Sequence, residues 1–298
     1  MFRESGRRDD TSTGFRPLKA YEFEQIRRLA HEKFGLDLRN GKEELVTARL
    51  GKRIRNAQFR SFEEYYQHVI SDQTGEALVD LIDSLTTNFT SFLREPAHFQ
   101  FLVDRVLPSI RNRNQIDIWC AGCATGEEPY SLAFTLLDAL HGSVKPQIRI
   151  LATDISTRAL ETAEAGVYAA GRFAEFPKLW LSRFLLRGNG KWEGAYQVKP
   201  EVRALIEFRR LNLIEPITNL SNFPVISCRN VMIYFDKDTQ QTVVNKLTDW
   251  IEPGGYLFIG HSESLTGVKH NLQYVQPAIY RKPENGGLPA KGRTRVSR

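Results

Sequence analysis

The amino-terminal part of the chain has the apolar spacing of amphipathic helices. Apolar residues recur at intervals of three and four in four segments, which are predicted to be helices: 21–35, 42–58, 61–70 and 75–85. Gly35 is placed to end the first helix, and Ser61, with acids two and three residues later, is placed to begin the third. Since no strand pattern interrupts it, residues 16–88 are predicted to form a small helical domain.

From about residue 100 the pattern changes to short apolar runs separated by helical segments. Six runs have the length and composition of strands: 115–121, 147–154, 204–212, 223–230, 254–261 and 273–282. This alternation predicts an α/β fold with a parallel or mostly parallel sheet and helices on both faces. The last two runs have no helix pattern between them, which favours an antiparallel hairpin at the sheet edge.

One segment does not fit the alternation, and the two ends of the chain have a different composition. Residues 183–203 contain glycine turns and short alternating runs, so a small antiparallel β-subdomain is predicted as an insertion at about 178–203. Residues 1–15 are polar and charged, and the tail 284–298 is rich in Gly, Pro, Lys and Arg. Both are predicted to be disordered. Residues 89–99 are interpreted as a linker to the α/β domain at 100–283.

Composition and charge narrow the class of protein. The 298 residues include no apolar run near 18 residues, and the N-terminus lacks the apolar region of a secretory signal. Three cysteines do not make a disulfide framework, and they fit a reducing cytoplasm. A cytoplasmic protein without direct membrane insertion is therefore expected. The net charge of +6 favours an acidic partner without naming one.

A glycine turn carries the first indication of a ligand site. The apolar run 115–121 passes through Gly122 and Gly126 into a helical pattern that begins with Glu127 and Glu128. Glycine allows the backbone to approach a ligand, and a helix N-terminus points unpaired N–H groups at it. The two acids would repel a phosphate. They suit a ligand with hydroxyls or positive charge, such as the ribose and sulfonium of S-adenosylmethionine.

Polar residues follow three further predicted strands. Asp154 ends the second run and is placed to bind ribose hydroxyls, whereas Asn212 is suited to the edge of an adenine. Asn230 ends the fourth run. Any one of them is more typical of a cap or turn, but together on successive strand ends they favour a ligand site. Of the acidic pair, Glu127 is preferred for the ligand, since Glu128 suits the helix dipole.

The cysteine and histidine patterns leave other chemistry weakly supported. Cys120 and Cys123 form a C-x-x-C, but a zinc site would need two further ligands, and buried small residues are favoured over a redox pair. His261 is either a general base or part of a polar turn. No metal site and no Ser/His/Asp order is predicted.

The motifs, in this order, resemble those of the CheR-type chemotaxis receptor methyltransferases. They are NFTSFLRE, AGCATGEEPYSLA, ATDIS, ETAEAGVY, CRNVMIYFD and GGYLFIGHSESL, and the resemblance covers roughly residues 16–283. It implies a Rossmann-like domain that transfers methyl groups from S-adenosylmethionine to glutamate side chains of chemoreceptors. The products would be glutamate methyl esters and S-adenosylhomocysteine. Leu93 and Ala124 depart modestly from the common pattern, which has Phe and Ser there.

The resemblance also implies site residues. The cofactor contacts it implies are Asn88, Thr90, Arg94, Glu127, Asp154, Asn212, Leu213, Arg229 and Asn230. The suspected catalytic pair falls on Arg94 and Tyr234, although Tyr234 also fits simple core packing.

The resemblance further implies contacts with a receptor. The predicted helix 42–58 has a basic face, which consists of Arg49, Lys52, Arg53 and Arg55. This face would complement acidic receptor helices, or it is an ordinary solvated face. The loop with Gly188 and Gly190 resembles that of family members whose β-subdomain binds a receptor's C-terminal peptide, where Trp192 would line a pocket or pack the hairpin. No nucleic acid partner and a monomer are expected.

Three alternatives stay open at this point. A methyltransferase of the same fold acting on RNA or another protein is compatible with the positive charge, but no aromatic and basic binding surface is evident. A non-catalytic protein could sense S-adenosylmethionine. A NAD-dependent oxidoreductase is disfavoured because the turn reads G-x-x-x-G instead of G-x-G-x-x-G.

Overall fold

The computed structural model describes residues 16–39, 41–86, 90–142 and 146–284. The two segments predicted to be disordered, 1–15 and all but the first residue of 284–298, lie outside the described residues. The chain divides into two compact units between residues 87 and 88, and each is described by itself.

The described part of the first unit is helical. Its helices are α1 (Ala20–Phe34), α2 (Glu43–Asn56), α3 (Phe62–Ser71) and α4 (Glu76–Leu85). All four lie within two residues of the predicted segments, which confirms the prediction. Gly35 takes a φ of 71° and ends α1, and the Ser61 side chain accepts a hydrogen bond from the Glu64 N–H at 3.2 Å. Apolar side chains spaced four apart, such as Val46, Leu50 and Ile54, are fully buried and belong to the unit's core.

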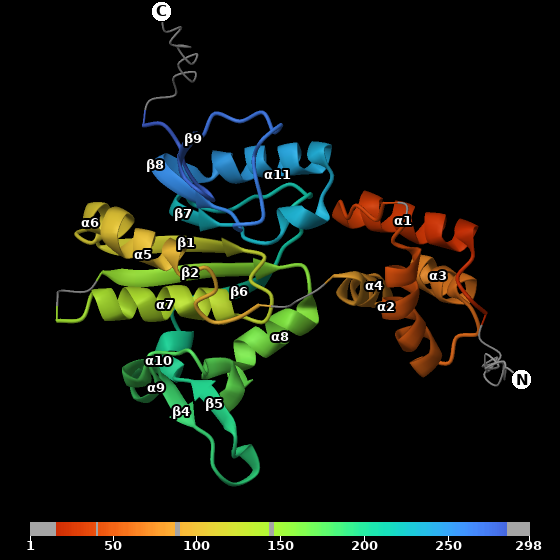
Figure 1. The fold of residues 1–298 in the computed structure, drawn as a ribbon, viewed down its shortest axis with the longest axis horizontal. Helices are drawn as coiled ribbons and strands as arrows, with labels where there is room; N and C mark the ends of the chain where they lie inside the picture. The colour runs from red at the N-terminus through yellow and green to blue at the C-terminus, as the bar shows by residue number, and fades with distance from the viewer. Residues whose placement is uncertain (1–15, 40, 87–89, 143–145, 285–298) are drawn as a thin grey trace, which may run out of the picture. The chain divides into compact units, whose positions relative to one another are not determined.

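The second unit is built on a mixed sheet of seven strands (Figure 1). Its order is β6-β2-β1-β7-β8-β10-β9, and the first five strands are parallel. Their bounds are β1 (Gln115–Ala121), β2 (Gln147–Asp154), β6 (Ile206–Arg210), β7 (Phe223–Ser227) and β8 (Ile251–Phe258). The α/β fold with a mostly parallel sheet is thus confirmed, and the carboxyl ends of these five strands meet at one edge.

Helices cover both faces of the sheet. Along β1, Ile118 and Cys120 belong to one buried cluster, and Trp119 and Ala121 belong to the other, as the two-residue period of a strand requires. The first cluster includes side chains of α7 (Glu127–Ala139), and the second those of α11 (Lys237–Asp249), which lie on opposite sides of the sheet in Figure 1. The remaining helical segments of this unit are α5 (Ala97–Phe101), η1 (Leu102–Val106), α6 (Leu107–Ile110), α8 (Thr157–Ala165), η2 (Ala170–Phe173), α9 (Lys178–Phe184), η3 (Gly190–Trp192), α10 (Pro200–Arg203) and η4 (Met232–Tyr234).

The edge after β8 is antiparallel, as predicted, but it contains one strand more than expected. The run 273–282 is divided into β9 (Gln273–Gln276) and β10 (Ile279–Arg281), and β10 pairs antiparallel with both β8 and β9. Ala278 has a φ of 64°, which turns the chain between the two strands.

The β-subdomain is a three-stranded antiparallel sheet in the order β3-β5-β4. The predicted hairpin is present as β4 (Leu185–Arg187) and β5 (Ala195–Val198), but residues 178–184 form the helix α9. The outer strand β3 (Val167–Ala169) precedes the predicted insertion and was not predicted. Aromatic rings of this region pack on α7, with Phe134 5.0 Å from Phe184 and 5.4 Å from Phe176 between ring centroids. The subdomain is therefore anchored on the helix that begins at the glycine turn.

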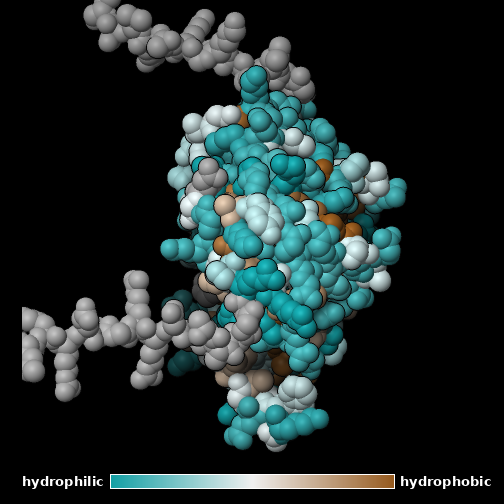
Figure 2. Space-filling model, turned by 90° about the vertical axis from the view of Figure 1, so that its right-hand side faces the viewer, coloured by the Kyte–Doolittle hydropathy of each residue, from teal (hydrophilic) through white to brown (hydrophobic). Residues whose placement is uncertain are grey.

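The face of the protein drawn in Figure 2 is largely polar. On the face shown in Figure 2 most residues are hydrophilic, and hydrophobic residues appear only as small patches. Within the described ranges, every helix is too short or too polar to cross a membrane.

Candidate active site

The predicted site residues follow successive strand ends at the carboxyl edge of the sheet. β1, β2 and β7 are in register there, with Cys120 opposite both Ala152 and Ser227. The chain after β6 is tied to β2 because the Leu211 N–H donates to the Asp154 carbonyl at 3.0 Å. The structure therefore brings the ends of these four strands together, as their parallel order requires.

The glycine turn after β1 is fastened to the end of β2. The N–H groups of Gly122 and Cys123 both donate to the Thr153 carbonyl, at 2.7 and 2.9 Å. Gly122 has a φ of 87°, and a Cβ there would overlap the Val231 side chain, so both conformation and space require glycine.

Asp154 lies against this turn. Its Oδ2 accepts from the Ala124 N–H at 2.8 Å, and its Oδ1 accepts from the Ser156 N–H at 2.9 Å. These two bonds, one to each oxygen, fix the orientation of the Asp154 carboxylate at the end of β2.

Glu127 is buried in the first turn of α7, with a side chain 1% exposed. Its carboxylate accepts from the Thr125 hydroxyl at 2.6 Å and pairs with Arg172 of η2. Arg172 also donates to the Thr90 carbonyl at 2.6 Å. This arginine joins three segments and was missed from the sequence, where nothing distinguishes it from a surface cation.

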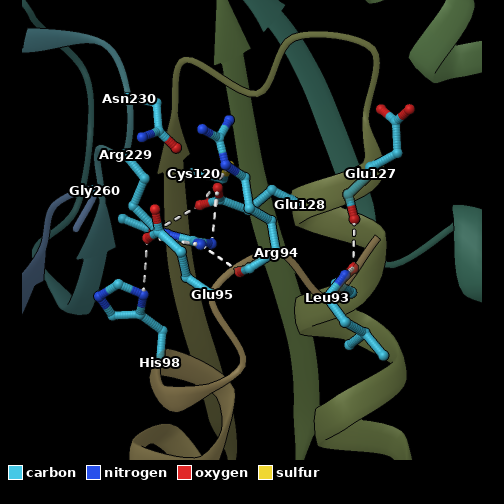
Figure 3. Close-up of polar contacts among 12 residues, drawn as sticks. Leu93, Arg94, Glu95, His98, Cys120, Glu127, Glu128, Arg229, Asn230 and Gly260 are labelled. Atoms are coloured by element: carbon cyan, nitrogen blue, oxygen red, sulfur yellow. Dashed lines mark hydrogen bonds and ion pairs between the residues drawn. The ribbon is translucent and has the colours of Figure 1, made fainter. Parts of the chain in front are cut away.

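A second ion-pair cluster lies behind the turn (Figure 3). It consists of Arg229, Glu95 and Glu128 and is called the Arg229 cluster below. The guanidinium, 2% exposed, lies 3.1 Å from a carboxylate oxygen of each glutamate. Glu128 also accepts from the Ser227 hydroxyl at 2.6 Å, so it does more than complement a helix dipole. The Arg229 side chain is therefore committed to this cluster.

The Arg229 cluster fixes the segment that carries Arg94. The Arg94 carbonyl accepts a hydrogen bond from Arg229, and the Leu93 N–H donates to the Ser131 hydroxyl of α7 at 2.9 Å. In Figure 3 the Arg94 side chain runs away from the cluster, toward the turn after β1 and on the same side as Asn230. The main chain of Arg94 is thus anchored while its guanidinium is directed to the carboxyl edge.

Burial and neighbouring charges together set the pKa values of the groups in and around the Arg229 cluster. Burial acts to raise the pKa of Glu95, but the Arg229 charge and the His261 N–H outweigh it, and the pKa is lowered. Burial, and then the Arg229 charge, lower the pKa of the neighbouring His98 to about 4, so its imidazole is neutral at neutral pH. Glu95, His98 and His261 are close enough to hold a metal ion. However, Arg229 already binds the Glu95 carboxylate, and this argues against such a use.

The other predicted residues have mixed placements. The Asn212 amide donates to Glu215 at 2.9 Å and its oxygen accepts from the Ile214 N–H at 3.3 Å, which is the geometry of a turn residue. Leu213 is buried in the core, and Tyr234 is half-buried at the end of η4. Asn88 lies outside the described residues.

The three cysteines are buried and unbonded to one another. The prediction that Cys120 and Cys123 are small buried residues is confirmed. Burial raises the pKa of all three thiols well above the ordinary value, so they are protonated and unreactive at neutral pH.

Similarity to known proteins identifies the family of this chain. Residues 88–280 match the model of the CheR methyltransferase SAM-binding domain, and residues 21–86 match that of the CheR all-alpha domain. Chemotaxis protein methyltransferase 2 of Pseudomonas aeruginosa is 39% identical over 260 residues, which cover 87% of this chain and 92% of that protein. The chain belongs to the CheR methyltransferase family. It is an S-adenosylmethionine-dependent chemotaxis protein methyltransferase.

A second chemotaxis methyltransferase agrees with this assignment. The Escherichia coli chemotaxis protein methyltransferase is 35% identical over 259 residues, 87% of this chain and 89% of that one. The N-methyltransferase NodS of Bradyrhizobium japonicum, solved with S-adenosyl-L-homocysteine, has a TM-score of 0.36 and 16% identity over 64% of this chain and 91% of that chain.

Proposed function

We propose that this CheR-family member methylates glutamate side chains of chemoreceptors, with Arg94 and Tyr234 as its catalytic side chains. The observation that carries the proposal is the anchoring of Arg94. Arg229 holds its carbonyl while its side chain is directed to the edge that carries Asp154 and Asn230 (Figure 3). An orientable guanidinium next to an acidic, hydroxyl-binding edge suits a carboxylate substrate beside a sulfonium cofactor.

The chemistry of this edge fits S-adenosylmethionine, which supplies a methyl group on a positively charged sulfonium. Carboxylates of Glu127 and Asp154 are suited to its ammonium and ribose hydroxyls. Asn212 and the main chain of Leu213 are suited to the adenine edge. Arg172 pairs with Glu127, so this arginine and a cofactor ammonium would share one carboxylate.

The residues have a limited task in the reaction. A substrate glutamate has a reference pKa near 4.3, so it is ionised at neutral pH and needs no general base. Arg94 would orient it through a single hydrogen bond, since binding both oxygens tightly would weaken the attacking one. The Tyr234 hydroxyl would assist. Alignment at roughly 3 Å can lower the barrier by several kcal/mol.

The test is a transfer assay with S-adenosylmethionine labelled in its methyl group. Purified protein is incubated with membranes that contain chemoreceptors, with and without the receptor's C-terminal segment. We expect base-labile label on the receptor. Label on RNA or on another protein would instead support the alternative substrates, and no label from protein that binds the cofactor would support a sensor.

The C-terminal arm of the assay addresses the β-subdomain. The Gly188 N–H is paired with the Ala195 carbonyl at 2.9 Å, and Trp192 is 55% exposed under Lys191. Leu186 of β4 is also exposed. An exposed tryptophan beside a short strand suits an extended peptide, and tethering would raise the local concentration of enzyme near receptors. If removing the segment leaves the rate unchanged, the β-subdomain does not act as a tether.

The four residues of the proposed receptor-docking face on α2 differ in exposure. Arg49 donates to the Leu85 carbonyl, Arg53 pairs with Asp80, and both are half-buried, whereas Lys52 and Arg55 are exposed to solvent. Because they are the exposed members of this face, Lys52 and Arg55 are proposed to make the docking contact with acidic receptor helices. The other two residues serve the helical unit itself.

Charge reversal separates docking from fold. We expect Lys52→Glu and Arg55→Glu, each alone, to slow receptor methylation several-fold at low salt, with a smaller effect at high salt because exposed charges are screened. Arg28→Glu, at an exposed position of α1, makes the same change in net charge and is the control. Initial rates and calorimetric cofactor affinity are measured. Equal slowing by Arg28→Glu would mean that net charge, and not this face, matters.

A further inference from the structure

The sequence GHSES after β8 has entered the site described so far only through His261. His261 is exposed, and its N–H donates to Glu95. Glu263, two residues later, is half-buried, and its carboxylate accepts hydrogen bonds from backbone N–H groups. Among the donors are Gly260 at 2.6 Å, Asn230 at 2.9 Å and Ile233 at 3.2 Å.

These donors belong to two loops that come from neighbouring strands. Gly260 follows β8, while Asn230 and Ile233 follow β7. Asn230 is a proposed cofactor residue with a φ of 58°, a left-handed conformation that costs free energy unless its surroundings hold it. Ile233 immediately precedes Tyr234. The Glu263 carboxylate therefore holds the turn after β7 at two points: at Asn230 itself and at Ile233, next to Tyr234.

The close approach of the two loops is built into the sequence at Gly260. A Cβ at this position would overlap the Asn230 amide nitrogen and would lie 2.9 Å from Glu263 Oε2. Any larger residue would push the loops apart and break the bonds to Glu263. Glycine and glutamate thus act together at one contact.

We propose that Glu263 is a positioning residue for methyl transfer, which holds Asn230 for the cofactor and η4 for Tyr234. The inference rests on the proposed function for the roles of those two residues. A carboxylate is needed because both oxygens accept N–H groups: Oε2 accepts those of Gly260 and Asn230, and Oε1 accepts that of Ile233. Glutamine would present an NH₂ group to at least one N–H, and aspartate would be one methylene too short.

The test compares Glu263→Gln with Glu252→Gln. Glu252 lies near the start of β8, at the end of the strand away from Gly260, and pairs with Arg113 at the surface. Its replacement should leave kcat unchanged. At saturating cofactor and receptor we expect Glu263→Gln to lower kcat by about 10- to 100-fold, as misplacement of reacting groups does. The KM for receptor should change less than threefold. Lower thermal stability with unchanged kcat would overturn the proposal.

A double variant tests whether Glu263 acts through Tyr234. If it does, adding Tyr234→Phe to Glu263→Gln should cost much less than Tyr234→Phe costs alone. Fully multiplicative losses in kcat would contradict the assignment. Should Glu263→Gln fail to fold, Glu263→Asp is measured in its place.

Cofactor binding distinguishes this inference from the proposed function. If wild type and Glu252→Gln both fail to methylate receptors, the proposed function has failed. Calorimetry with S-adenosylhomocysteine then measures whether the contact between Glu263 and Asn230 affects cofactor affinity. A several-fold weaker affinity of Glu263→Gln than of Glu252→Gln would support positioning, and equal affinities would overturn it.

Discussion

Replacing Arg229 with methionine should lower the free energy of unfolding of the larger unit by about 3–5 kcal/mol, since it leaves two buried carboxylates without a cation. Glu95 and Glu128 are 13% and 12% exposed, so water cannot replace the lost partner well. Urea denaturation followed by tryptophan fluorescence measures the change. The control is Arg149→Met, which removes an exposed arginine 3.8 Å from Asp117 and should cost less than about 1 kcal/mol.

The pH dependence of the same pair of proteins gives a check with a defined sign. His98 and Glu95 both have lowered pKa values in the folded protein, so acid removes stability. The stability that depends on His98 is lost as the pH falls from 6.5, the ordinary pKa of histidine, to about 4. The stability that depends on Glu95 is lost as the pH falls below 4.5, the ordinary pKa of glutamate. Without Arg229, the pKa of Glu95 should rise and that of His98 should fall less. The variant should therefore lose less stability than wild type between pH 6.5 and 4, and an equal loss would contradict this account.

Arg94→Ala should reduce methyl transfer by about 100-fold, because the substrate carboxylate would lose the hydrogen bond that aligns it with the methyl group. Cofactor affinity should change far less, because the contact with Arg229 is made by the carbonyl and survives the substitution. Single-turnover transfer of a labelled methyl group and calorimetry with S-adenosylhomocysteine give the two quantities.

Arg94→Lys is the matched variant for this prediction. It keeps the positive charge but loses the planar donor fork, so we expect an intermediate rate. Losses of equal size in turnover and in cofactor affinity would mean that Arg94 serves cofactor binding alone. A lysine variant with the full rate would show that charge, without directed hydrogen bonding, is sufficient.

Local sequence signals were enough for much of the fold. Helix α1 begins and ends within one residue of its predicted bounds because an apolar stripe and Gly35 both specify it. The strand ends with Asp154 and the glycine turn were also predicted, since polar and small residues interrupt apolar runs there. Strand β3 was missed because three residues are too few to show alternation.

The contacts that organise the site were not predictable in this way. Arg229 meets residues more than 100 positions earlier, and Arg172 meets a carboxylate 45 positions away. In sequence Arg172 looks like an ordinary surface cation, and Arg229 was singled out only by the family motif, as a cofactor contact and not as the centre of an ion-pair cluster. Their burial and pairing follow only from the order of strands in the sheet. The same holds for Glu263, whose partners come from two different loops.

The way in which Arg94 is held has an evolutionary consequence. Arg229 secures its carbonyl, a contact that a different residue at position 94 could also make. If Arg94 is catalytic as proposed, a copy with another residue there would keep this contact while losing activity, and it would compete with the active enzyme for cofactor and receptor. Gene duplication followed by one substitution at this codon would thus convert an enzyme into its own inhibitor.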